Sequence, residues 1–374
     1  MIQWLIKVEC FYLLWTKSTT MTHSPRRYLM YIAQNYSFAI LRPLQQAILK
    51  QGGQVCWFFE GNDVEGDFLH ADEQRLTSVA DVKAWQPDAV FVPGNVVPRC
   101  IPGVKVGVFH GFNAGKLNRR GREDHFEIRG CFDLYCTQGP DTTVRFTQLA
   151  QQYGFFKVKQ TGWPMLDPLF TEPASNPYCA VDDPRPTILM CSTFSRNLTC
   201  APHLYETVKA LVATGKWRWL VQFHPKMAAE TVAQYKALQG PNLMFVETDN
   251  VIPVLQAADV MLCDTSSILL MFLLQGKPVV TFNNQHPLPH LLNVTTTDEV
   301  EHALSEALTY PVDLMVHIKH YCQQIHPYQD GCSSERVLAA TNALLDNGLR
   351  ELKSKPLNIV REFKMRKKLG FWGL

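Results

Sequence analysis

Several motifs that mark common nucleotide and metal sites are missing from this chain of 374 residues. No G-x-G-x-x-G follows a predicted strand, which excludes the usual fingerprint of a nicotinamide or flavin site. Residues 111–116 (GFNAGK) resemble a P-loop, but they have one residue too few between the glycines, and Leu117 replaces the metal-binding serine or threonine. No D-x-D occurs, so the usual carboxylate cradle for a nucleotide-bound metal is missing. The sequence therefore predicts a site that uses no cofactor and no metal ion.

A strong net charge and paired cysteines are missing as well. Lys and Arg total 36 and Asp and Glu total 34, so the formal net charge is +2. Because a protein that binds nucleic acid over much of its surface is normally strongly basic, we predict no nucleic-acid partner. The 11 cysteines include no pair with C-x-x-C spacing, which argues against structural zinc and a thioredoxin-like site. We interpret them as buried, reduced thiols of a cytoplasmic protein.

The first residues are apolar without the length of a membrane span. Residues 1–17 carry Lys7 and Glu9 and are too short and too interrupted to cross a bilayer. They also lack the small-residue cleavage site of a signal peptide. Two interpretations of an N-terminal extension over residues 1–21 stay open: an appended helix, or an artefact of start-site choice.

The last residues combine basic and aromatic side chains. Residues 361–374 (REFKMRKKLGFWGL) interleave lysines and arginines with Phe363, Phe371 and Trp372. A short basic segment with aromatic residues can lie on an anionic membrane surface. One interpretation is a peripheral protein on the inner face of the cytoplasmic membrane. The other is a cytoplasmic protein whose solvated tail packs back on its body.

The middle of the chain alternates short apolar runs with amphipathic stretches. Before residue 170 the pattern predicts strands at 28–33, 55–59, 89–94, 104–111, 132–139 and 157–163, with helices at 38–51 and 140–153. After a Pro-rich linker at 171–186 it predicts strands at 187–193, 217–225, 243–247, 259–266 and 277–282, with helices at 204–215, 228–238, 251–258 and 267–276. Two or three further helices finish the chain. Such alternation indicates parallel sheets covered on both faces.

We therefore predict an α/β protein of two facing Rossmann-like domains. The first domain spans residues 22–170, the second spans 187–350, and a basic amphipathic tail occupies 351–374. In sheets of this class, ligands bind beyond the carboxyl ends of the strands. The polar residues at the predicted strand ends are therefore the candidates for function.

Four polar clusters follow predicted strands. They are His110 and Gly111 with Lys116; Ser192 and Thr193 with Arg196; His224 with Pro225; and Asp264, Thr265, Ser266 and Ser267. Together they suit a phosphate, because histidine and lysine supply positive charge while hydroxyls and helix N–H groups supply donors. Glu247, at another strand end, could hold the ribose or base of a nucleotide. Structural alternatives stay open for each: Asp264 as a helix cap, His110 and His224 as turn residues, and Glu247 as a surface carboxylate.

Taken in order, these segments resemble the CDP-glycerol glycerophosphotransferase family, the teichoic-acid primases and polymerases of GT-B fold. The resemblance runs from about residue 104 to 280 and rests on residues 109–111 with Lys116, 162–167, 188–196, 224–225, 258–267 and 276–280. The chain departs from the family pattern at Met165, Thr265 and Ser192, on the acceptor side and at the glycerol end of the donor. The resemblance therefore supports the class of reaction more firmly than the identity of the chemical group that is moved.

The resemblance implies a GT-B-like fold and a transferase. It would move a polyol phosphate, most simply glycerol phosphate, from a CDP-linked donor to a hydroxyl of a saccharide or lipid-linked acceptor, with release of CMP. It implies His110 as the general base and His224, with the hydroxyls of Ser266 and Ser267, as donors to the departing CMP. Two alternatives stay open: a GT-B glycosyltransferase that uses a nucleotide sugar, and a non-catalytic member that binds a nucleotide or glycan.

Overall fold

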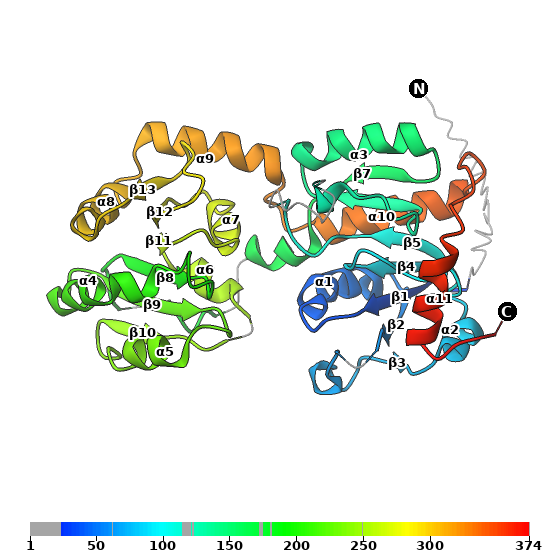
Figure 1. The fold of residues 1–374 in the computed structure, drawn as a ribbon, viewed down its shortest axis with the longest axis horizontal. Helices are drawn as coiled ribbons and strands as arrows, with labels where there is room; N and C mark the ends of the chain where they lie inside the picture. Colours follow the sequence, from blue (N-terminus) through cyan, green and yellow to red (C-terminus); the bar gives the residue numbers. More distant parts are fainter. Residues whose placement is uncertain are drawn as a thin grey trace, which may run out of the picture.

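The computed structural model describes residues 24–61, 63–113, 121, 123–171, 175–179, 182–248 and 250–373. Lys116 and the N-terminal extension considered over residues 1–21 lie outside the described residues. Two α/β units lie side by side (Figure 1). The first holds strands β1 to β7 and the second holds strands β8 to β13.

The described residues of the first unit form a parallel sheet with the strand order β3-β2-β1-β4-β5-β6-β7. Its strands are β1 (Arg27–Ile32), β2 (Gln54–Phe59), β3 (Arg75–Leu76), β4 (Ala89–Val92), β5 (Val104–Gly107), β6 (Leu134–Thr137) and β7 (Lys157–Gln160). The inner strands β1, β4 and β6 are almost wholly buried, as their apolar runs predict. Helices α1 (Ser37–Lys50), α2 (Val79–Trp85) and α3 (Pro140–Tyr153) cover the two faces.

The described residues of the second unit form a parallel sheet with the order β10-β9-β8-β11-β12-β13. Its strands are β8 (Thr187–Ser192), β9 (Arg218–Phe223), β10 (Leu243–Phe245), β11 (Val260–Cys263), β12 (Val279–Phe282) and β13 (Leu292–Val294). Its helices are α4 (Ala201–Thr214), α5 (Ala229–Lys236), α6 (Ile252–Ala257), α7 (Ile268–Leu273) and α8 (Val300–Ala307). The two-sheet α/β architecture predicted from the alternation is confirmed.

Helix boundaries follow local signals in the sequence. Helix α3 begins at Pro140 and ends before Gly154, which adopts a left-handed conformation, as the interval 140–153 predicts. Helix α4 likewise ends before Gly215, also left-handed. Helix α2, strand β3 and strand β13 were not predicted. Helix α2 is short and begins with a capping box between Ser78 and Asp81.

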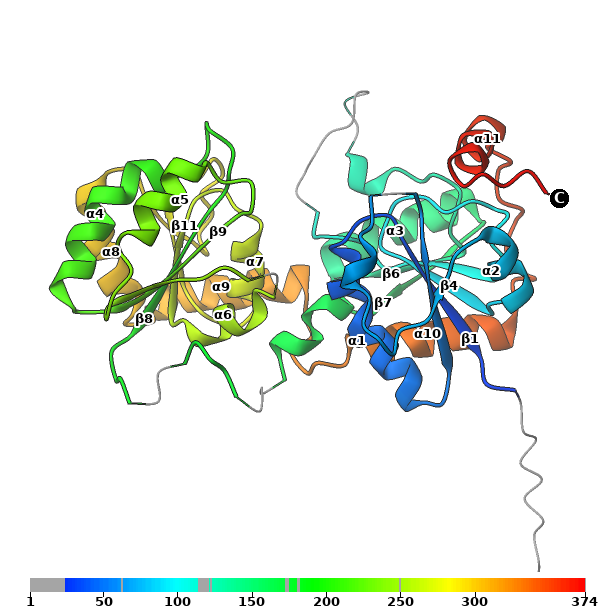
Figure 2. The same cartoon turned by 90° about the horizontal axis from the view of Figure 1, so that it is seen from below.

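The chain returns to the first unit near its end (Figure 2). Helix α9 (Val312–Ile325) leads out of the second unit, and helix α10 (Ser333–Asn347) packs against α1 of the first. The Asp167 carboxylate accepts the backbone N–H groups of Ser333 and Ser334 at 2.7 and 2.8 Å, so it caps α10. The predicted second domain, residues 187–350, includes α10. The amphipathic pattern of α10 does not indicate which sheet the helix covers.

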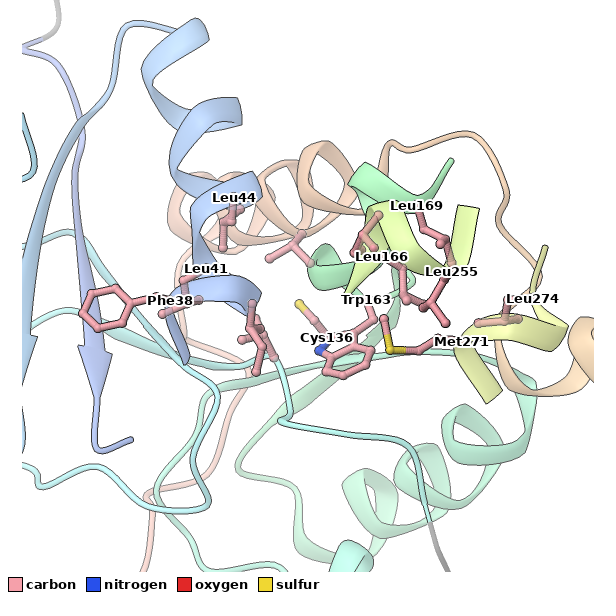
Figure 3. Packing of buried hydrophobic residues seen from close by; sticks show 14 of the residues in the cluster. Phe38, Leu41, Leu44, Cys136, Trp163, Leu166, Leu169, Leu255, Met271 and Leu274 are labelled. Atoms are coloured by element: carbon pink, nitrogen blue, oxygen red, sulfur yellow. The ribbon is translucent and has the colours of Figure 1, made fainter. Parts of the chain in front are cut away.

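The two units share one apolar core (Figure 3). The short helix η3 (Pro164–Leu169) lies between them, and its Leu166 and Leu169 face Leu41 and Leu44 of α1 on one side and Leu255 of α6 on the other. Gln256 adds hydrogen bonds to the carbonyl groups of Pro168 and Leu169, both at 3.1 Å. Because this apolar surface is buried continuously across both units, it holds the carboxyl ends of the strands of one sheet in place relative to those of the other.

Three further features bear on the expectations from the sequence. Most of the described cysteines are buried and all of them are unpaired. Among the described residues, no helix is long and apolar enough to cross a membrane. No group of three or more His, Cys, Asp or Glu side chains in this part of the chain could hold a metal ion.

Candidate functional site

Strand β5 ends in a kink that turns His110 toward the second unit. Phe109 adopts a left-handed backbone conformation with φ of 60°, which is rare for an aromatic residue. Its carbonyl accepts the indole N–H of Trp163 at 3.3 Å, and its ring stacks on His125 at 5.0 Å. A strained backbone persists only where its surroundings hold it in place, and such positions cluster at functional sites.

The ring of His110 has a defined hydrogen-bonding state. Its Nδ1 lies 3.1 Å from the carbonyl oxygen of Pro93. Because a carbonyl only accepts, Nδ1 must carry the proton, and in the neutral ring Nε2 then carries the free lone pair. The side chain is exposed, with the ring of Tyr36 at 5.9 Å. His110 is therefore arranged to accept a proton through Nε2.

His110 lines a cleft of about 430 Å³ between the two units. Gly111 shares its wall, and Ser267 contributes from the second unit. Most of the remaining wall is apolar or aromatic and comes from both units: Tyr36, Ile40, Phe112, Trp163, Met165, Val251, Ile268, Leu270 and Met271. The cleft thus combines His110, a potential base, with surfaces suited to an apolar or ring-shaped molecule.

His125 also lines this cleft, although no sequence pattern indicates it. Burial, with a smaller contribution from nearby His110, lowers the pKa of His125 to about 4, so the ring stays neutral at neutral pH. Its Nε2 has no hydrogen-bond partner among the described residues. His125 follows no strand and belongs to no motif, so only its place in the fold brings it beside His110.

His224, at the end of β9, has the opposite hydrogen-bonding state. Its Nδ1 accepts the backbone N–H of Lys226 at 3.0 Å, so in the neutral ring the proton must lie on Nε2. Burial, with a smaller contribution from the Lys226 charge, lowers the pKa of His224 and favours that neutral ring. The ring of Phe194 lies 4.4 Å away and fixes its orientation. His224 is therefore arranged to donate through Nε2.

His224 lines a separate hollow of about 720 Å³ within the second unit. Pro225 and Glu247 lie in the same wall. The Glu247 carboxylate pairs with the Lys236 ammonium at 2.8 Å, and both side chains are largely exposed. The structure thus brings His224, Pro225 and Glu247 together in one hollow and His110, Gly111 and Ser267 together in the other.

Two of the predicted ligand residues, Asp264 and Ser192, have structural contacts in the second unit. Asp264 is fully buried, and its carboxylate accepts the Ser192 hydroxyl at 2.6 Å and the backbone N–H of Cys200 at 3.0 Å. Ser192 is itself buried and accepts the backbone N–H of Ala201 at 3.3 Å. Their oxygen atoms are hydrogen-bonded below the surface, and neither side chain lines the cleft of His110 or the hollow of His224, so a ligand contact for them stays a prediction. Asp264 does not cap α7, since its carboxylate binds the backbone N–H at the start of α4.

The remaining candidates lie nearer the surface. Arg196 and Ser267 are exposed, whereas Thr193, Thr265 and Ser266 are half-buried. The Thr193 backbone N–H is bound to the Asp264 carboxylate. The Thr265 hydroxyl accepts the backbone N–H of Gln285 at 3.0 Å. Helix α7 has only six residues, fewer than the interval 267–276 predicts, so its dipole contributes little to any phosphate site.

No family model and no curated protein matches the sequence. Solved structures do match its fold. A Listeria monocytogenes protein assigned as a UDP-N-acetylglucosamine 2-epimerase matches with a TM-score of 0.61 at 16% identity, over 87% of this chain and 98% of its own. A variant of the wall teichoic acid polymerase TagF soaked with CDPG matches with a TM-score of 0.59 at 13% identity, over 86% and 89%.

The fold is GT-B-like. A third structure, S. aureus MnaA with UDP, matches with a TM-score of 0.54 at 14% identity, over 88% of this chain and 100% of its own. Identities this low show a shared fold, and they confirm the GT-B-like architecture that the resemblance implied. The structural neighbours are enzymes, and the forms named here include complexes or soaks with CDPG and UDP.

Proposed function

We propose that this protein transfers a polyol phosphate, glycerol phosphate in the simplest case, from a CDP-linked donor to a hydroxyl of a saccharide or lipid-linked acceptor. CMP is the second product. The observation that carries the proposal is the pair of histidines at strand ends with opposite ring states: Nε2 of His110 can accept a proton and Nε2 of His224 can donate one. A base for the attacking alcohol and a hydrogen-bond donor to the leaving group both accelerate phosphoryl transfer.

The proposed reaction begins at His110. Its Nε2 takes the proton of the acceptor hydroxyl while the oxygen attacks the phosphorus of the polyol phosphate group. A new P–O bond forms, and the P–O bond to the CMP oxygen breaks. The electron pair of that bond leaves with CMP, whose phosphate gains negative charge. The Nε2–H of His224 would donate to this charge, with the exposed guanidinium of Arg196 as a further partner.

The two hollows suit the two ends of such a reaction. The cleft around His110 offers aromatic walls from Tyr36, Phe112 and Trp163, against which the apolar face of a sugar ring can stack. The hollow around His224 is lined by polar and apolar groups in similar measure, including Glu247, which could bind ribose hydroxyls. Acceptor and polyol would occupy the first hollow and the nucleotide the second.

A nucleotide-sugar enzyme is the second candidate, since two of the matching structures are a protein assigned as a UDP-N-acetylglucosamine 2-epimerase and MnaA with UDP. Incubation with CDP-glycerol, CDP-ribitol, UDP-sugars and CMP-sugars, each with and without a panel of saccharide and lipid-linked acceptors, separates the candidates. We expect CMP release from a CDP-polyol that depends on the acceptor. Turnover of UDP-sugars alone would replace the proposal with the second candidate. Tight nucleotide binding without turnover of any donor would assign a binding role.

A further inference from the structure

Helix α11 (Ile359–Lys368) attaches to the first unit through polar groups. The Glu362 carboxylate accepts the backbone N–H of Arg99 at 3.0 Å, and the Lys368 ammonium pairs with the buried carboxylate of Glu60 at 3.0 Å. The Arg361 guanidinium donates to the Arg129 carbonyl. Met365 is the one residue of this helix that is buried. These contacts fix which side of the helix faces the protein.

The opposite side of α11 exposes large apolar side chains to solvent. Ile359 is 72% exposed, Val360 71% and Phe363 58%. Leu357, just before the helix, is 64% exposed, and Trp372, just after it, is 57% exposed with its ring 5.2 Å from that of Phe363. A surface helix of a globular protein normally buries its apolar side. Here the arrangement is inverted, and these five residues form what we call the outer face of α11.

The outer face also carries positive charge. Lys364 and Lys367 are exposed beside it, whereas Glu362 faces the protein. A hollow of about 590 Å³ adjoins the apolar residues and is lined in part by Arg361 and Lys364. Apolar side chains can enter the boundary between headgroups and acyl chains, while lysine and arginine attract lipid phosphates. Exposed apolar area next to cationic groups matches an anionic bilayer better than it matches water.

We propose that the outer face of α11 docks the protein on an anionic phospholipid surface. Figures 1 and 2 both place α11 on the first unit, at the end away from the second unit. Docking there leaves the cleft between the units uncovered. The proposal rests on the contacts and exposure of α11 and is independent of the proposed reaction.

Vesicle flotation of the full chain tests the proposal. We expect binding to phosphatidylcholine vesicles that contain about one third phosphatidylglycerol, and much weaker binding to pure phosphatidylcholine. The triple variant Ile359→Ser, Val360→Ser, Phe363→Ser should lower the partition coefficient by about tenfold or more. The matched control is Val312→Ser with Val316→Ser on α9, where the two valines are 77% and 59% exposed. This control should float like the unchanged chain.

A second variant keeps the apolar residues and changes the charge. Lys364→Glu with Lys367→Glu should remove the preference for anionic vesicles. If the triple variant does not fold, this double variant alone tests the proposal. Absence of flotation of the unchanged chain, or equal flotation of all variants, would overturn the proposal. Sedimentation velocity identifies the rival occupant: a dimer that the triple variant dissociates, with no vesicle binding, would show that this face joins two copies of the chain.

Discussion

The histidines of the two units are held by backbone groups of opposite kind. His110 donates from Nδ1 to the Pro93 carbonyl, whereas His224 accepts at Nδ1 from the Lys226 N–H. The neutral rings therefore present a lone pair at Nε2 in the first unit and a proton at Nε2 in the second. A motif therefore identifies the histidine, while the neighbouring backbone group determines whether its Nε2 accepts or donates a proton. Substitutions that can donate a hydrogen bond but cannot take a proton should separate the two.

Substitution of His110 should have the largest effect. His110→Ala removes the proposed base, so turnover of a CDP-polyol should fall by about a hundredfold to ten-thousandfold. His110→Gln should fall equally, because an amide does not take up a proton. Steady-state rates of CMP release give turnover and the KM for the donor, and the KM should change little. His203→Gln, at an exposed position on α4, is the control. Near-normal turnover of His110→Gln would end the assignment of a base here.

Substitution of His224 should have a smaller effect with a different pattern. His224→Ala removes a donor to the departing CMP, which lowers turnover by about a hundredfold to a thousandfold. His224→Gln keeps an N–H donor near the position of Nε2, so it should recover about tenfold of that loss. The same CMP-release assay compares both variants. If glutamine restores activity at His110 but not at His224, the two roles are exchanged.

The sequence predicted the framework that carries both histidines. Buried runs such as β8 and β11 read as strands because a parallel sheet covered on both faces needs continuous apolar side chains. The limits of the predicted strands in turn indicated His110 and His224 as residues near strand ends. Pro140 and Gly154 also predicted where α3 begins and ends.

Contacts between distant segments were beyond prediction. Asp264 directly precedes the segment that leads into α7, yet its carboxylate binds the N–H of Cys200 just before α4. Strands β8 and β11 are neighbours in the sheet, which brings Cys200 beside that carboxylate. His125 lines the cleft from the short 3-10 helix η2 (Asp124–Phe126), which no sequence pattern predicted. The ring states of both histidines depend on single backbone groups, and no sequence motif records where a carbonyl points. The sequence therefore predicted which residues lie at the carboxyl edge of each sheet better than it predicted which of their atoms are free to bind a ligand.

A third histidine, His326, is buried, whereas His110 and His224 are exposed. His326, where α9 ends, is 1% exposed, and its Nε2 accepts the Trp163 backbone N–H at 3.0 Å. Burial lowers the pKa of His326 to about 4, compared with about 6.5 in the unfolded chain. Between these values the unfolded state binds a proton that the folded state does not. The free energy of unfolding should therefore fall as the pH drops from about 6.5 to about 4.

The loss from this one group is on the order of 3 kcal/mol across that interval, and it stops below the folded pKa. Urea unfolding at a series of pH values measures it. His326→Gln keeps an acceptor for the Trp163 N–H but does not titrate, so its stability should depend less steeply on pH in this interval. His203→Gln is again the control. An unchanged slope for His326→Gln would mean that the imidazole is hydrated in the folded state. In that case, burial would not distinguish His326 from the two exposed histidines.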